Sequence, residues 1–252
     1  MHLLALTFAL SLPFAPTGTG MGDARLPGLA DQTVPERYRG RNVINKPKGF
    51  SEKVVALTFD DGPDPSNTPK VLTLFAKYNG HTTFFVIGSY AKRQQALLRM
   101  AAKRGHVIGS HTWSHSAKPT AKKAGPEIWM TAKTIHDATG VWPSVFRPPY
   151  GITGNLTSKV ARQDRYGVIV WNRSSADTAL QNVIGTQPGD IVLMHDGPGK
   201  TKTIKALPSI LQVLDRKGYK FITVPDMLRR WDAFETLKAQ RAAAKKAGAH
   251  AK

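Results

Sequence analysis

The sequence predicts an α/β fold in which helices alternate with the strands of a parallel sheet. From residue 51 to residue 230, short runs of β-branched and aromatic residues alternate with longer segments whose apolar residues recur at helical spacing. Such alternation is typical of a parallel sheet with crossover helices, either as an open doubly wound sheet or as a closed barrel. Polar motifs directly follow several of the apolar strands, where barrel enzymes carry their chemistry, and this favours the barrel.

The expected elements follow one another in a regular order. Strands are expected at 54–59, 82–87, 106–108, 145–146, 167–171, 190–194 and 219–224. Helices are expected at 68–78, 94–104, 126–138 and 202–217. Pro126 suits the first turn of its helix, where a backbone N–H has no partner within the helix. We therefore expect about seven parallel strands in a single domain.

The composition excludes several kinds of chemistry. The chain has 252 residues, of which 41% are hydrophobic, so it can bury a sizeable core. It contains no cysteine. A thiolate nucleophile, a cysteine-ligated zinc and a disulfide framework are therefore excluded.

The formal net charge of +19 has three interpretations. It can attract nucleic acid, it can attract an anionic cell wall or membrane, or it can serve solubility. The basic residues are scattered outside the C-terminal tail, and no nucleic-acid-binding motif accompanies them. An anionic cell-wall polymer is therefore a candidate partner of the basic surface, with solubility as the alternative, and nucleic acid is not expected to bind.

The two ends of the chain differ from its centre. Residues 1–22 are predicted to be a secretory signal segment, because a short apolar run is followed by small residues, although no Lys or Arg precedes it. Residues 23–50 are expected to be an extended leader, 51–230 the folded domain and 231–252 a basic, frayed tail. We expect a secreted or cell-envelope protein without a transmembrane helix.

Four short segments carry residues suited to catalysis. They read, in chain order, T-F-D-D-G-P at 58–63, H-T-W-S-H at 111–115, R-P-P-Y-G at 147–151 and L-M-H-D at 193–196. Together they can supply three ligands for a divalent metal, a spare carboxylate base, a cation that stabilises an anion, and an acid. This inventory suits the metal-assisted hydrolysis of an acyl bond.

The chemistry of the individual residues supports this interpretation. Asp60 and Asp61 repel each other in a confined site unless a metal and an arginine give them different environments. His111 and His115 are four residues apart, which on one helical turn places both on the same face, within reach of a single metal. Arg147 precedes two prolines, and this stiff, extended segment suits a cation that fixes a buried carboxylate.

The order and spacing of the four segments resemble the polysaccharide deacetylases of carbohydrate esterase family 4, the NodB-homology domain, over roughly residues 50–230. The resemblance implies a distorted (β/α) barrel of about seven strands. It implies a divalent metal, zinc or alternatively cobalt, and assigns the metal ligands as Asp61, His111 and His115. The other roles it implies are general base for Asp60, orientation of that base for Arg147, oxyanion binding for the Tyr150 N–H, the acetyl pocket for Leu193 and general acid for His195.

One segment departs from the family pattern. The family carries Asp-x-x-Asp-Trp after the strand that is expected to end near residue 171. Asp177 matches the second aspartate, which is expected to tune the acid histidine. Ser174 replaces the first aspartate, and Thr178 replaces the tryptophan that lines the substrate groove. The replacements put the preferred sugar in question rather than the catalysis.

The predicted function is removal of acetyl groups from a polysaccharide that contains N-acetylglucosamine, of the peptidoglycan or chitin type. One alternative is O-deacetylation of xylan, since the same site can cleave an ester. A second is a non-catalytic wall-binding relative, but such a protein usually loses a ligand or the base. A nucleic-acid binder would show a steep salt dependence that survives chelation.

Overall fold

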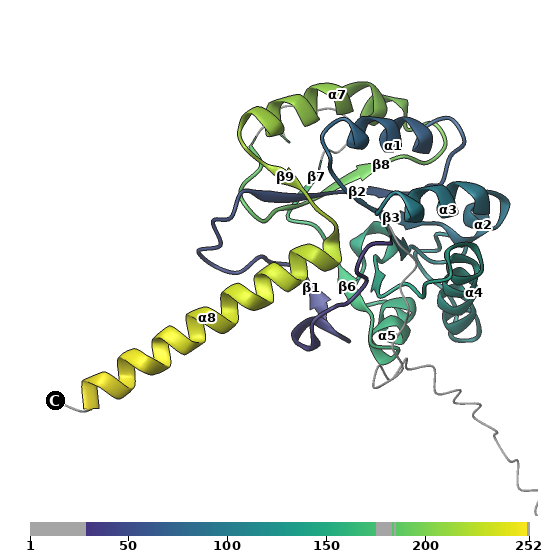
Figure 1. The fold of residues 1–252 in the computed structure, drawn as a ribbon. Coiled ribbons are helices and arrows are strands. Elements are labelled where there is room, and N and C mark those ends of the chain that lie inside the picture. The colour runs from purple at the N-terminus through teal and green to yellow at the C-terminus, as the bar shows by residue number, and fades with distance from the viewer. Residues whose placement is uncertain (1–28, 175–182, 184, 251–252) are drawn as a thin grey trace, which may run out of the picture.

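The computed structural model describes residues 29–174, 183 and 185–250, the last three without their side chains (Figure 1). The predicted signal segment, Asp177 and Thr178 lie outside these residues. Within the described part, no helix combines the length and hydropathy needed to cross a bilayer.

A single parallel sheet forms the centre of the molecule. Its strands are β1 (Asn42–Val43), β2 (Val54–Asp60), β3 (Thr83–Val86), β4 (Val107–Ser110), β5 (Val145–Phe146), β6 (Gly167–Ile169), β7 (Arg173–Ser174), β8 (Ile191–His195) and β9 (Lys220–Phe221). Their order is β1-β6-β5-β4-β3-β2-β8-β7, with β9 beside β2. Among the described residues no pairing joins β1 to β7, so the sheet is an open, distorted barrel. The predicted fold class is confirmed, and two short strands, β1 and β7, add to the seven expected.

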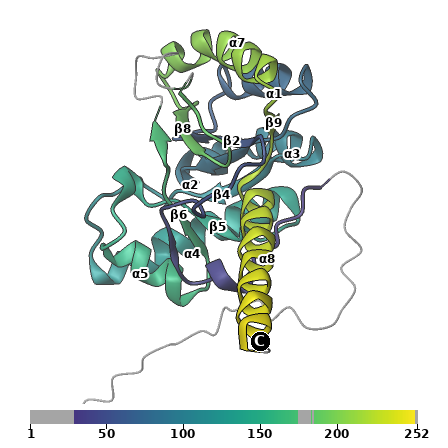
Figure 2. The same ribbon diagram turned by 90° about the vertical axis from the view of Figure 1, so that its left-hand side faces the viewer.

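Helices cover the outside of the sheet (Figures 1 and 2). They are α1 (Thr68–Ala76), α2 (Gly88–Arg93), α3 (Gln95–Lys103), α4 (Ala121–Thr139), α5 (Leu156–Gln163), α7 (Thr201–Arg216) and α8 (Val224–His250), with short 3₁₀ turns η1 (Glu36–Tyr38) and η2 (Pro149–Gly151). Helix α4 begins earlier than predicted because the Thr120 carbonyl already accepts the N–H groups of the first turn. Pro126 therefore lies inside the helix, and not in its first turn.

Strand β2 connects the core to the interior of the barrel. All seven of its residues are buried. Val55, Leu57 and Phe59 belong to the apolar cluster beneath α1 and α7, whereas Val54 and Ala56 face a second cluster inside the barrel. Since side chains alternate between the two faces of a strand, Thr58 and Asp60 continue the line of Val54 and Ala56. The strand thus directs one carboxylate into the barrel interior.

Both ends of the described chain pack more closely than predicted. Within the expected leader, Val34, Val43 and Phe50 are buried, and β1 pairs with β6. Within the expected tail, Trp231 is fully buried in the second core cluster. The boundaries predicted at residues 50 and 230 therefore cut through packed structure. The tail is also helical rather than frayed, because α8 continues to His250 in a segment rich in strong helix formers.

Candidate active site

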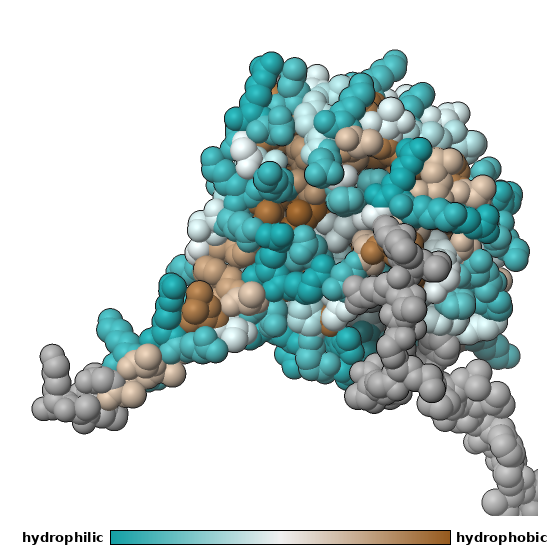
Figure 3. Space-filling model, viewed as in Figure 1, coloured by the Kyte–Doolittle hydropathy of each residue, from teal (hydrophilic) through white to brown (hydrophobic). Residues whose placement is uncertain are grey.

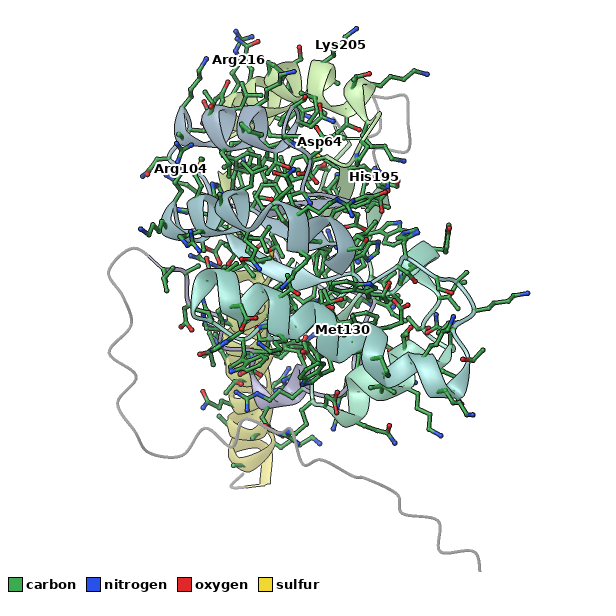
Figure 4. The ribbon with its side chains drawn as sticks, turned by 90° about the vertical axis from the view of Figure 1, so that its right-hand side faces the viewer. Asp64, Arg104, Met130, His195, Lys205 and Arg216 are labelled. Atoms are coloured by element: carbon green, nitrogen blue, oxygen red, sulfur yellow. The ribbon has the colours of Figure 1, made fainter. Side chains whose placement is uncertain are left out.

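The catalytic candidates lie at the carboxyl ends of neighbouring strands. Asp60 ends β2, His111 directly follows β4, Arg147 directly follows β5 and His195 ends β8. In the register of β2 and β8, Asp60 and His195 are opposite each other. Figure 4 labels His195 on this side of the molecule, together with Asp64 from the loop that follows β2. The fold thus brings together residues that are up to 135 positions apart in the sequence.

Asp61, His111 and His115 form a cluster that could hold a metal ion, with one ligand atom from each lying within 4.8 Å of the others. The Asp61 Oδ1 atom is 3.6 Å from the Nε2 of His111 and 3.3 Å from the Nε2 of His115. Two ligands of a tetrahedral zinc ion, with bonds of about 2.0–2.1 Å, are separated by roughly 3.4 Å. The geometry therefore fits a small divalent metal.

The chemistry of the ligand atoms fits a metal as well. The Nδ1 atom of His111 lies 2.7 Å from the Arg147 carbonyl oxygen, which leaves Nε2 free to bind a metal. Burial, together with the neighbouring His115, lowers the pKa of His111 to about 3, so the ring is neutral, as a metal ligand must be. Asp61 Oδ1 is buried and has no hydrogen-bond partner among the described residues.

The histidine pair lies on a loop and not on the helical turn that the spacing suggested. Thr112 and His115 both have left-handed backbone angles, with φ values of 65° and 60°. The His115 N–H donates to the Thr112 hydroxyl, which closes the turn. Glu127 of α4 accepts the N–H groups of Trp113 and Ser114 at 2.8 Å each. Sequence reasoning missed Glu127 because no local pattern shows that α4 supports the loop that carries His111 and His115.

A fully buried ion pair lies beside the cluster of Asp61, His111 and His115. Arg147 Nη1 donates to Asp60 Oδ1 and to the Thr58 hydroxyl, both at 2.7 Å. The guanidinium lies over the Phe85 ring, 4.1 Å from its centre. Burial raises the pKa of the Asp60 carboxyl, and the Arg147 cation opposes this shift. Asp60 is thus a fixed carboxylate whose proton affinity is increased, as general-base catalysis requires.

The remaining candidates surround this centre. Leu193 is 6% exposed and lies opposite Thr58 on one side and Ser174 of β7 on the other. Tyr150 has a left-handed backbone, with φ of 58°, and its ring centre is 4.8 Å from that of His115. Tyr150 is 66% exposed, which places an aromatic surface beside His115 at the edge of the Asp61, His111 and His115 cluster.

Asp196, which follows the candidate acid, is a buried residue that sequence reasoning missed. Its Oδ2 accepts a 2.5 Å hydrogen bond from the Thr68 hydroxyl, and its N–H donates to the Asp60 carbonyl. The carboxylate packs so tightly on Gly62 that a Cβ there would lie 2.4 Å from Asp196 Oδ1. These contacts join the loop that carries Asp61 to the end of β8. An acid after the histidine in L-M-H-D was the available signal.

The Asp196→Asn variant is expected to flatten the pH dependence of stability in the metal-free protein. Burial raises the pKa of Asp196 from 3.8 to about 7, with Asp60 and Asp61 acting in the same direction. The stability that the neutral carboxyl contributes is complete below about pH 4 and is lost as the pH rises through about 7. A shift of this size corresponds to roughly 4 kcal/mol.

Urea unfolding between pH 4 and pH 8 measures this effect. Asparagine still accepts the hydrogen bond from Thr68 and carries no charge, so the variant should lose less stability than the unchanged protein across this window. Asp215→Asn, at an exposed position of α7, is the matched control. Identical pH profiles for Asp196→Asn and the unchanged protein would show that folding does not raise the pKa of Asp196.

The fold and the site together define an open (β/α) barrel in which two histidines and an aspartate, a group that could hold a metal ion, lie beside a buried aspartate-arginine pair. The profile of the polysaccharide deacetylase family matches residues 48–169. A peptidoglycan-N-acetylglucosamine deacetylase of Bacillus cereus is 35% identical over 192 residues, which are 71% of this chain and 90% of the relative. The chain belongs to the polysaccharide deacetylases, carbohydrate esterase family 4.

Two further comparisons bear on the site. The crystal structure of the Bc1960 peptidoglycan N-acetylglucosamine deacetylase superposes with a TM-score of 0.69 at 31% identity, over 77% of this chain and 97% of that chain. A bifunctional xylanase/deacetylase of Pseudobutyrivibrio xylanivorans is 34% identical over 185 residues, which are 70% of this chain and 31% of the relative. Relatives named for two different polysaccharides thus match similar shares of the chain.

Proposed function

We propose that this chain is a metal-dependent deacetylase that hydrolyses the acetamido group of N-acetylglucosamine in peptidoglycan. The observation that carries the proposal is the position of the Asp61, His111 and His115 cluster next to the buried Asp60–Arg147 pair, with His195 opposite Asp60. The Bacillus cereus relative and the Bc1960 structure, both named for this activity, support the substrate class.

Each residue has a defined part in the proposed reaction. A divalent metal, zinc in preference to cobalt, would polarise the acetyl carbonyl and position the attacking water when held by the three ligands. Asp60, oriented by Arg147, accepts a proton from that water. The Tyr150 N–H donates to the oxyanion. His195 then gives a proton to the departing sugar amine, which is a poor leaving group without one.

Two details of the surroundings fit this reaction. Leu193, next but one to the acid on β8, is apolar and 6% exposed, as a wall for the acetyl methyl group should be. His111 is held neutral by burial and so remains a ligand at the pH at which Asp60 acts as a base. Asp177, which lies outside the described residues, is proposed to tune the acid.

The second candidate function is O-deacetylation of acetylated xylan, which the xylanase/deacetylase relative favours. The same metal, base and oxyanion donor would act on an ester. Ser174 and Thr178 replace two residues of the family pattern, so the sugar preference has to be measured. The presence of all three ligands, the base and the acid argues against a non-catalytic relative.

The proposal also includes the location of the protein at the cell envelope. Export through the apolar segment 1–22 to the cell envelope would bring the enzyme to a wall glycan. The net charge of +19 then suits an anionic polymer of the same wall as a second partner.

Acetate release from a panel of polymers tests the function. Peptidoglycan, chitooligosaccharides and acetylated xylan are incubated with the zinc-loaded enzyme. We expect release from peptidoglycan and from chitooligosaccharides, and slower release from xylan. Faster release from xylan would favour the second candidate, and no release from any polymer by the zinc-loaded protein would reject both.

A further inference from the structure

Helix α8 leaves the body of the domain as a basic rod. Figures 1 and 2 show it extending away from the sheet towards the C-terminus. Residues 236–247 are exposed, and from residue 236 to the end of the chain there is no acidic residue. Such a rod gains little from packing, so it is free to contact another molecule.

Three of the cations of this rod lie on one face. Lys238, Arg241 and Lys245 are separated by three and four residues, the spacing that lines up side chains along a helix. At 1.5 Å per residue they follow one another at about 4.5 and 6 Å along the axis. Among the described residues, no acid forms an ion pair with Arg241 or Lys245, and Lys238 has a 3.8 Å contact with Glu235. The cations repel one another, and this repulsion would be relieved by an anionic polymer.

A groove lies where this basic face meets the domain. Its volume is about 400 Å³, and its lining includes Phe50, Arg230, Phe234 and Leu237. Phe50 and Phe234 meet edge to face, and Lys238 extends over the Phe234 ring. Figure 3 shows apolar surface on the part of α8 nearest the domain body. The groove thus offers an apolar floor beside Lys238, whereas Arg230 is paired with Glu52 and Asp226.

We propose that the basic face of α8, with the groove at its root, is a docking surface for a phosphodiester-linked polymer of the cell wall. The partner rests on the proposed function, because such a polymer shares the wall with the glycan substrate. Repeated phosphates match the row of cations, and the uncharged backbone between them matches the floor formed by Phe234 and Leu237. A membrane fits less well, because Leu237 is the only large apolar residue of the described helix beyond Phe234.

The position of α8 leaves the catalytic site free. The helix packs through Trp231 against the cluster that contains Val54 and Ala56, near the start of β2. Asp60 is at the other end of that strand. At roughly 3.3 Å per residue it lies about 20 Å from Val54. Docking at α8 therefore holds the catalytic end near the glycan without covering it, which raises the local substrate concentration.

A charge-removal variant with a matched control tests the proposal. The test variant is Lys238→Gln, Arg241→Gln, Lys245→Gln. The control, Lys77→Gln, Lys103→Gln, Arg216→Gln, removes the same charge from exposed positions in α3, in α7 and directly after α1. Binding to purified cell walls is measured over a range of salt concentrations, with the phosphodiester polymer either present or chemically stripped. Turnover is measured on a soluble chitooligosaccharide.

We expect the unchanged enzyme and the control to bind intact walls and to be released by salt, whereas the test variant binds at least tenfold more weakly. Stripping the walls should abolish this difference, and all three proteins should turn over the oligosaccharide equally. Equal binding by the test variant would overturn the proposal. The proposal would also be overturned if the unchanged enzyme bound a single-stranded oligonucleotide or anionic vesicles more tightly through α8 than it bound intact walls. If none of the three proteins, including the unchanged enzyme, turned over the oligosaccharide, this would instead reject the proposed function.

Discussion

Replacing His111 by alanine is expected to remove the metal and the deacetylase activity together. The imidazole is buried, its Nε2 is one of the three ligand atoms, and Asp61 and His115 alone would hold a divalent ion poorly. Acetate release should therefore fall to background. The metal content of the purified variant, measured by mass spectrometry, and acetate release from a chitooligosaccharide are the two readouts.

A control and a reversal complete this experiment. His136→Ala removes a half-exposed histidine from α4, outside the site, and should leave both readouts unchanged. Chelation of the unchanged enzyme should abolish acetate release, and added zinc should restore it. Full activity in a preparation verified to be free of metal would contradict the assignment of Asp61, His111 and His115 as ligands of a required ion.

The sequence predicted those parts of the fold that leave a periodic pattern over enough residues. The strand ending at Asp60 was visible because all of its residues are buried and apolar or β-branched before the carboxylate. Helix α2, with six residues, and strand β7, with two, are too short to leave such a pattern. Strand β1 was hidden for the same reason within a segment rich in Gly and Pro. No local pattern showed that Trp231, in the predicted tail, belongs to the same buried cluster as Val54, nearly 180 positions earlier in the chain.

The candidate residues of the site were predictable because they lie at strand ends, but their local conformations were not. Asp61, Thr112, His115 and Tyr150 all have positive φ angles, between 58° and 70°. Only a minority of non-glycine residues adopt this conformation, and four such residues around one centre indicate that the surrounding structure imposes it. The helical turn expected for the histidine pair was wrong for this reason. Long-range contacts such as those of Glu127 with the ligand loop are not encoded in local sequence.

The Asp60→Asn variant should keep the metal and lose the reaction. Asparagine preserves the shape of the side chain and can still accept a hydrogen bond from Arg147, while Asp61, His111 and His115 are unchanged. It cannot accept the proton of the attacking water. Acetate release should fall by at least roughly a hundredfold, as is typical when general-base catalysis is lost.

The Asp60→Asn substitution also lowers the stability of the fold, and this effect must be separated from the loss of the general base. Arg147 is fully buried and would lose its charged partner, and breaking a buried ion pair costs about 3–5 kcal/mol. The folded fraction of Asp60→Asn should therefore be measured by circular dichroism at the assay temperature, and turnover expressed per folded, metal-loaded molecule.

The acid and the base can be distinguished in the same series. His195→Ala leaves the metal ligands and the Asp60–Arg147 pair in place, so the variant should bind metal. It should lose more activity on an N-acetyl sugar than on an O-acetyl ester, because an alkoxide needs less help from a proton donor than an amine does when it leaves. Asp60→Asn should instead slow both reactions, since both need the proton of the attacking water removed. Near-full turnover by metal-loaded Asp60→Asn, or equal losses on amide and ester for His195→Ala, would show that the roles of these two residues are assigned wrongly.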